Sequence, residues 1–229
     1  LHGLNRAGST CRLLESERPL ADCYYRNAEQ AESYYLDTTG SFEEYLEGLG
    51  KSIRLRIYNR RKLLNSLGEV KYERLSTDNL DELFEALNYL HEMRWESPVF
   101  AHNRLEFNQC VASLFAEKNQ LAFSQLSVDG VPVSIQYNFV AKEREYNIQG
   151  GFNEGFHRNL SPGYLHFGYA VEQAFSGTTV AYDFLVGKGK HSQYKANLTK
   201  TSLTVVDIQI IRPWIHRMLY RLYDRFRVV

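Results

Sequence analysis

Residues 146–195 constrain the fold of this 229-residue chain more strongly than any other stretch. Polar and apolar side chains alternate from Tyr146 to the glycine pair at 150–151, which predicts a strand. The motif S-P-G at residues 161–163 predicts a helix start, because serine caps helices and proline suits the first helical position. We expect this helix to cover about residues 162–176, with Gly177 ending it in the left-handed conformation.

The β-branched and aromatic run Thr178–Leu185 predicts a second strand after this helix. A strand, a helix and a strand in so short a span form a right-handed crossover, and the two strands are then parallel. The N–H groups and positive dipole of the helix start lie beside the carboxyl end of the first strand. This arrangement suits a phosphate, although most units of this kind bind none.

The elements around this unit predict an α+β fold with a mixed, twisted sheet flanked by helices. Asp129-Gly130 is a strong hairpin signal inside a three-stranded meander, and Pro213 opens an amphipathic helix. In chain order, the other predicted elements are a strand at residues 33–37, a helix from Ser41, a basic helix at 51–62, a strand at 69–75, helices at about 80–90 and 105–117, the meander at 120–151, a strand at 203–210 and the helix from Pro213.

Two features of the meander lead to more detailed expectations. Apolar residues occupy every second position from Val131 to Phe139, so this strand is expected to have one buried face. The charged run at residues 142–145 is expected to form the turn that follows.

Composition limits the class of protein. Apolar residues make up 44% and charged residues 24%, as in ordinary globular proteins, and no apolar run approaches the length of a membrane helix. The formal net charge is zero, so no whole-molecule field favours DNA or a membrane surface. The three cysteines are widely spaced, which predicts free thiols and a cytoplasmic location. Because Leu1 is not an initiator methionine, the chain is expected to be part of a longer protein.

Three pieces of the sequence carry a resemblance to a known family. They are the run from Gly151 that ends in S-P-G-Y-L, the run Y-D-F-L-V-G at residues 182–187, and the pair Y-K at 194–195. Their order and spacing resemble the GNAT acetyltransferase superfamily. More narrowly, they resemble its branch found with bacterial cellulose and exopolysaccharide biosynthesis, which is related to the Fem-type peptidoglycan aminoacyltransferases. The resemblance covers roughly residues 33–209, and the familiar GNAT pyrophosphate loop, Q/R-x-x-G-x-G/A, is absent.

The resemblance implies an acyl donor, acetyl-CoA or a longer acyl-CoA. Its thioester would lie where the two parallel strands part, with the pantetheine along residues 147–151 and the pyrophosphate at the helix start. The cofactor-binding residues implied in this way are Gln149, Gly150, Gly151, Ser161, Pro162, Gly163 and Tyr164.

Three residues are candidates for catalysis. A carboxylate at Asp183, on an apolar strand, needs a partner, and Lys195 is the expected one. Lys195 would stabilise the oxyanion, or would only pair with Asp183 and hold the loop. The resemblance implies that Tyr194 is the acid for the departing thiolate; the alternative is a packed aromatic residue.

Basic residues are candidates for substrate binding. Residues 51–62 hold six basic side chains and no acid. Arg56, Arg60 and Arg61 would therefore line the binding site of an anionic substrate, or would form a solvated helix face. Lys188 and Lys190 lie on a glycine-bounded loop and are further candidates. No metal site is predicted, because H-E-M-R-W at residues 91–95 lacks the second histidine of H-E-x-x-H.

The sequence therefore predicts a GNAT-like domain at residues 33–210, with an extension or remnant of a preceding domain at 1–32 and a C-terminal helix at 211–229. The predicted function is acyl-CoA-dependent N- or O-acyl transfer to a small molecule or glycan precursor of the cell envelope or exopolysaccharide. One alternative is a Fem-like transferase that uses aminoacyl-tRNA. Another is an inactive GNAT-fold binding module, which the absent pyrophosphate loop favours.

Overall fold

The computed structural model describes residues 1–17, 20, 22–186 and 193–227. The chain divides into two compact units. The larger unit consists of Tyr35–Leu185 and Tyr194–Lys200, and the smaller one of Leu1–Tyr34, Val186–Gln193 and Thr201–Val229.

The larger unit contains the strand–helix–strand element predicted from the sequence. Its helix begins at Pro162 and ends at Ser176, as expected, whereas Gly177 has an extended conformation (φ −104°) and not the left-handed one. The elements are α2 (Phe42–Gly48), α3 (Lys51–Arg54), the π-helical turn η1 (Leu55–Asn59), α4 (Arg61–Asn65), β3 (Val70–Leu75), α5 (Leu80–Trp95), α6 (Asn103–Ala116), β4 (Leu121–Val128), β5 (Val131–Ala141), β6 (Arg144–Phe152), α7 (Pro162–Ser176), β7 (Ala181–Val186) and α8 (Gln193–Leu198).

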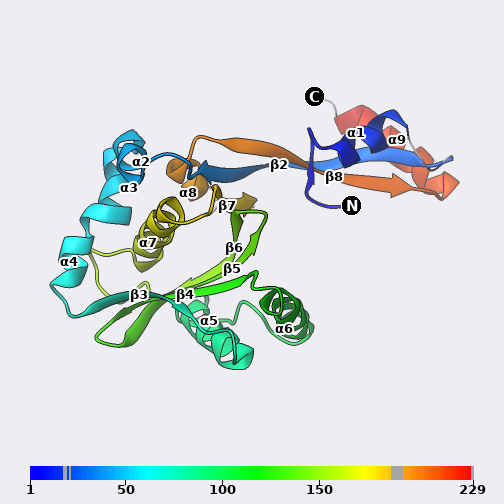
Figure 1. Cartoon of the computed structure of the whole chain (residues 1–229). Coiled ribbons are helices and arrows are strands. Elements are labelled where there is room, and N and C mark those ends of the chain that lie inside the picture. The colour runs from blue at the N-terminus through cyan, green and yellow to red at the C-terminus, as the bar shows by residue number, and fades with distance from the viewer. Residues whose placement is uncertain (18–19, 21, 187–192, 228–229) are drawn as a thin grey trace. The chain divides into compact units, whose positions relative to one another are not determined.

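These strands form a mixed sheet in the order β7-β6-β5-β4-β3. Strands β6 and β7 are parallel, as the short crossover through α7 predicts, and the other neighbours are antiparallel. Helix α7 lies on one side of the sheet, and α5 and α6 lie on the other (Figure 1). The α+β fold with a mixed sheet flanked by helices is therefore confirmed.

Strand β5 is covered on both faces, which corrects the prediction of one buried face. Its apolar side chains Ile135 and Tyr137 pack with Phe84 and Leu87 of α5 in an apolar cluster. Its intervening polar side chains are also buried, because they lie on the side of the sheet that α7 covers. The alternating residues of this strand therefore face two different buried environments, an apolar cluster with α5 and a polar layer under α7.

The polar side chains on the α7 side bond to one another. Glu145 accepts a hydrogen bond from the Asn138 amide at 2.6 Å and forms an ion pair with Arg74 at 2.6 Å. The Tyr182 hydroxyl donates to Gln136 at 3.0 Å. Glu145 is buried within β6, so the predicted turn at residues 142–145 is wrong in its second half. A buried carboxylate is stable here because a cation and an amide satisfy it.

His166 joins α7 to this polar layer. Its two ring nitrogens lie 3.0 Å from the Ser124 hydroxyl and 2.8 Å from the Ser134 hydroxyl. Burial of the ring, with a smaller contribution from the charge of Arg74, lowers the pKa of His166 to about 3. The imidazole is therefore neutral at physiological pH, donating one hydrogen bond and accepting the other.

A glycine lets α7 approach the π-helical turn. A Cβ built on Gly168 would lie 2.0 Å from the carbonyl oxygen of Ile57. This separation is far below a van der Waals contact, so any side chain at position 168 must push α7 away from η1.

Replacing Gly168 with alanine is expected to destabilise the chain by about 1–3 kcal/mol, because overpacking forces backbone shifts. The matched control is Gly48→Ala, since no atom lies within 4 Å of a Cβ built there. Urea unfolding of both variants checks the prediction. Equal unfolding midpoints would contradict it.

The smaller unit is built on three antiparallel strands. Its elements are β1 (Leu4–Asn5), α1 (Ser9–Ser16), β2 (Tyr24–Asp37, whose last three residues belong to the larger unit), β8 (Ser202–Ile211) and α9 (Trp214–Arg227). Strand β8 pairs with both β1 and β2. Cys11 and Leu14 of α1 pack on Val206 and Ile208 of β8 and form a small apolar core.

Candidate active site

The parallel strands β6 and β7 part after a short region of pairing. Their register runs from Arg144 opposite Ala181 to Tyr146 opposite Asp183, although β6 continues to Phe152. Residues of β6 from 147 onward are paired with β5 on one side only. The backbone groups on the other side of β6 are therefore available to a ligand that lies between the strands.

The backbone of β7 bends just after this pairing ends. Leu185 has a positive φ of 58°, which is unusual for a residue other than glycine. The Asp183 carboxylate accepts a hydrogen bond from the Leu185 N–H at 2.8 Å and so stabilises the bend. Asp183 is buried and forms an ion pair with Arg144 at 3.0 Å.

Lys195 binds the same bend from α8. Its ammonium group donates to the carbonyl oxygen of Phe184 and, at 3.1 Å, to that of Leu185. Burial lowers the pKa of Lys195 to about 8, while the negative charge of Asp183 acts in the opposite direction. Asp183 and Lys195 thus influence each other electrostatically, and both hold the backbone of β7. The role of Arg144 as an ion-pair partner of Asp183 was not predicted from the sequence.

Tyr194 lies in an aromatic cluster at the start of α7. Its ring centroid is 6.2 Å from that of Tyr164 and 6.0 Å from that of Phe167. Burial, together with the neighbouring Tyr164, raises the pKa of Tyr194 to about 12, and the positive charge of Arg94 opposes this rise. The phenol therefore keeps its proton at physiological pH, which suits a proton donor.

The start of α7 offers backbone N–H groups. Ser161 is the N-cap residue, but its side chain makes no capping hydrogen bond, so that part of the prediction is wrong. Pro162 has no N–H, and the Leu165 N–H donates to the carbonyl oxygen of Ser161. The N–H groups of Gly163 and Tyr164 have no partner within the helix, so these two can bind an anion.

The glycines proposed for cofactor binding have a packing role. A Cβ on Gly163 would lie 2.8 Å from the ring of Phe152, and one on Gly151 would lie 2.8 Å from the carbonyl oxygen of Leu87. Gly150 has more room, and its N–H donates to the Gln149 side chain at 3.0 Å. Gly151 and Gly163 therefore bring α5 and α7 close to β6, which positions the edge where the strands part.

The basic residues predicted to bind substrate have different surroundings. The exposed side chain of Arg56 places its guanidinium 5.4 Å from the ring centroid of Tyr164. Arg61 instead pairs with Glu172 at 2.6 Å and stacks 3.8 Å over Tyr169, so it helps to pack α4 on α7. Arg60 is half-buried at the start of α4. Lys188 and Lys190 lie outside the described residues.

Arg94 is a candidate that the sequence reading missed. Its guanidinium lies 4.6 Å from the ring centroids of both Trp95 and Phe152 and donates to Glu154 at 3.0 Å. Its charge also reaches Tyr194, as the pKa of that residue indicates. Arg94 lies in the H-E-M-R-W stretch, where an arginine directly before a tryptophan is the sequence signal that points to it.

A protein-family comparison matches the middle of the chain. The model described as an acetyltransferase (GNAT) domain matches residues 51–196, which include β6, α7, β7 and Tyr194. No curated protein matches the chain.

Solved structures with little sequence identity have the same fold. A structure titled FemX has a TM-score of 0.64 at 10% identity and covers 93% of this chain and 70% of its own. A conserved protein of unknown function from Bacteroides thetaiotaomicron has a TM-score of 0.62 at 12% identity, with 91% and 68% covered. The structure titled L-PGS from Bacillus licheniformis has a TM-score of 0.58 at 9% identity, with 98% and 72% covered.

Proposed function

Because the chain belongs to the acetyltransferase (GNAT) domain family, we propose that it transfers an acyl group from acetyl-CoA or a longer acyl-CoA to an amine or hydroxyl. The acceptor we propose is a small molecule or glycan precursor of the cell envelope or exopolysaccharide. The observation that carries the proposal is the parting of β6 and β7 after Tyr146 and Asp183, beside the start of α7.

The residues present fit the chemistry of an acyl-CoA. The free edge of β6 at residues 147–151 offers backbone donors and acceptors to the amides of a pantetheine arm. The N–H groups of Gly163 and Tyr164 suit the pyrophosphate, with Arg56 near Tyr164 as a further cation. When bound, the donor supplies an activated thioester carbonyl.

The roles of the protein groups follow from their protonation and contacts. Tyr194 carries a proton at physiological pH and would donate it to the departing thiolate sulfur. Asp183, Lys195 and Arg144 would act as positioning residues, because their contacts hold the bend of β7 that opens the site. Lys195 is thus proposed to act on the backbone instead of on the oxyanion.

Calorimetric titration with acetyl-CoA and longer acyl-CoAs tests the donor. Binding of at least one of them, with release of free CoA when an acceptor is added, supports the proposal. Binding without turnover for any amine or hydroxyl acceptor would favour the inactive binding module, and no binding at all would reject the acyl-CoA donor.

One observation favours an aminoacyl-tRNA donor as a second candidate. Lys51, Arg56 and Lys62 are exposed on the segment that packs beside α7, and no acidic residue interrupts residues 51–62. Such a surface suits a polyanion. Binding of tRNA that weakens steeply with salt would support this donor, and salt-insensitive binding would reject it.

Replacing Lys195 with methionine tests its positioning role. The change leaves two carbonyl oxygens without their buried donor, and we expect a loss of about 1–3 kcal/mol in stability. The control is Lys62→Met, because Lys62 is exposed. A variant that is as stable as wild type but inactive would instead assign Lys195 a direct role in catalysis.

The stabilities of wild type and Lys195→Met are expected to depend differently on pH. Between about pH 8 and the ordinary lysine pKa of 10.5, the folded chain binds fewer protons at Lys195 than the unfolded chain does. The contribution of Lys195 to the free energy of unfolding therefore rises with pH in this window. We expect the stability difference between wild type and Lys195→Met to increase from pH 8 to pH 10, as measured by urea unfolding.

A further inference from the structure

The smaller unit exposes the apolar face of α9. Six large apolar side chains of this helix are between 47% and 79% exposed, which is the opposite of a helix packed on a core. They are Trp214, Ile215, Met218, Leu219, Leu222 and Phe226. Among the described residues, no helix combines the length and apolar character needed to cross a membrane, so this face is not part of a described spanning helix.

The polar side of α9 is the side that contacts the strands. Asp224 forms an ion pair with Arg26 of β2 at 2.6 Å and accepts a hydrogen bond from the Tyr24 hydroxyl at 3.0 Å. The Arg26 guanidinium also lies 4.7 Å from the ring centroid of Tyr220. Because these contacts fix the helix by its polar side, its apolar side is turned away from the strands.

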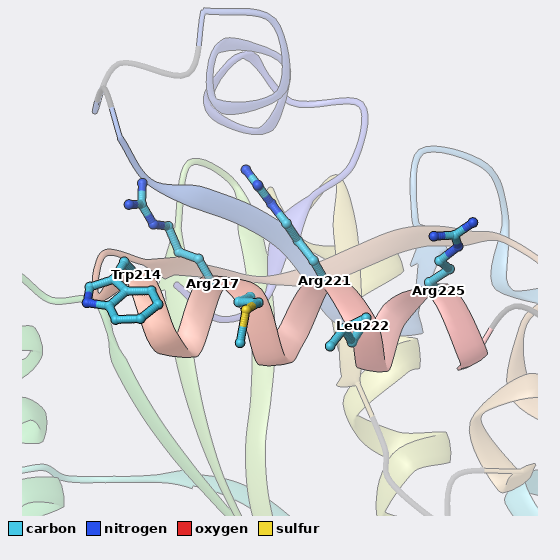
Figure 2. A pocket seen from close by; sticks show the side chains of 6 residues that line it. Trp214, Arg217, Arg221, Leu222 and Arg225 are labelled. Carbon is cyan, nitrogen blue, oxygen red and sulfur yellow. The ribbon is translucent and has the colours of Figure 1, made fainter.

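Arginines border the apolar face. Figure 2 shows Arg217, Arg221 and Arg225 along one edge of a groove on α9. The groove is also lined by Trp214, Met218 and Leu222. Asp224, the acidic residue of α9, forms its ion pair with Arg26 of β2, so its charge is already compensated there.

We propose that α9 binds the surface of a membrane that contains anionic phospholipids, with its axis in the plane of the headgroups. The apolar face would enter the boundary between headgroups and acyl chains, and the arginines would contact lipid phosphates. A helix with a strongly basic edge and exposed Trp, Leu and Phe has the composition of a helix that lies in this interface. Charge complementarity favours an anionic lipid surface over a second copy of the chain, because two copies would bring their arginines together.

The first experiment follows Trp214 in the full chain. The chain has two tryptophans, so a Trp95→Phe background leaves Trp214 as the only one. We expect its emission to shift to the blue with phosphatidylcholine vesicles that contain phosphatidylglycerol, and much less with phosphatidylcholine alone. The shift should decrease as salt is added. No shift with the anionic vesicles would overturn the proposal.

Two pairs of variants separate the apolar and the electrostatic contributions. Phe226→Glu should weaken vesicle co-sedimentation at least about tenfold, since it puts a charge into the apolar face. The matched control is Phe107→Glu on α6, because Phe107 is 67% exposed and lies in the other unit. Arg225→Gln should weaken binding roughly fivefold, because each basic residue near the surface contributes about 1 kcal/mol. Its control is Arg158→Gln, an exposed arginine of the larger unit.

Arg225 is the suitable arginine because Arg217 donates to the carbonyl oxygen of Asp22 and Arg221 lies 5.5 Å over Tyr24. Circular dichroism confirms that each variant is folded. Unchanged vesicle binding by Phe226→Glu would overturn the proposal, as would equal losses in Phe226→Glu and Phe107→Glu. A dimer that Phe226→Glu dissociates, without vesicle binding by wild type, would show that a second copy covers this face instead.

Discussion

Tyr194→Phe is expected to lower kcat for acyl transfer by about 10²–10⁴-fold while leaving the chain folded. The substitution removes only the hydroxyl, so the ring contacts with Tyr164 and Phe167 remain. The loss should appear in kcat, because proton donation to the thiolate occurs in the transition state and not in donor binding. Steady-state kinetics with an identified acceptor, together with calorimetry of acyl-CoA binding, measure the two quantities separately.

The matched control is Tyr45→Phe. Tyr45 is another half-buried tyrosine whose pKa is raised by burial, and its hydroxyl donates to the Leu198 carbonyl oxygen at 3.0 Å. In the part of the chain that the structure describes, its ring contacts are with Phe42 and Phe175 and not with the rings around Tyr194, so kcat should be unchanged in this variant. Equal kcat values for Tyr194→Phe and wild type would remove Tyr194 from the mechanism.

Acid is expected to destabilise the chain through His166. In the unfolded chain this histidine takes up a proton near pH 6.5, whereas in the folded chain its pKa is about 3. Below pH 6.5 the unfolded state therefore binds more protons, and stability falls as the pH falls. The full shift corresponds to roughly 5 kcal/mol, of which about 2–3 kcal/mol should be lost by pH 4.5.

His166→Gln isolates this contribution from that of the carboxylates. The amide of glutamine can donate to one serine and accept from the other without titrating, so the variant should lose less stability than wild type between pH 7 and pH 4.5. His157→Gln, which changes a histidine outside the buried polar layer, should follow the wild-type curve. Urea unfolding at each pH provides the measurement, and parallel curves for wild type and His166→Gln would contradict the prediction.

Local signals were enough to predict the element that carries the site. The S-P-G motif determined the start of α7, and the short crossover determined that β6 and β7 are parallel. Gly177 shows the limit of such signals, since the helix ends there with an extended residue. A glycine permits the left-handed conformation but does not require it.

The partners of buried polar groups were not predictable in the same way. The charged neighbours of Glu145 predicted a turn. In the folded chain its carboxylate instead forms an ion pair with Arg74 and accepts a hydrogen bond from Asn138, and both partners lie on other strands. Likewise, Asp183 meets Arg144 because the parallel register brings the start of β6 beside β7. These contacts depend on which strands become neighbours, and a single sequence does not contain that information locally.

The contact of Lys195 on α8 with the backbone of β7 limits how the sequence of such a domain can change during evolution. Tyr194 and Lys195 are consecutive, so the residue that binds the bend also fixes where the tyrosine ring lies. A substitution that alters the bend therefore displaces both residues at once, so a single change there disturbs the whole site. Positions such as the exposed Arg56 and the half-buried Arg94, which hold no backbone bend, are freer to vary without rebuilding the strands.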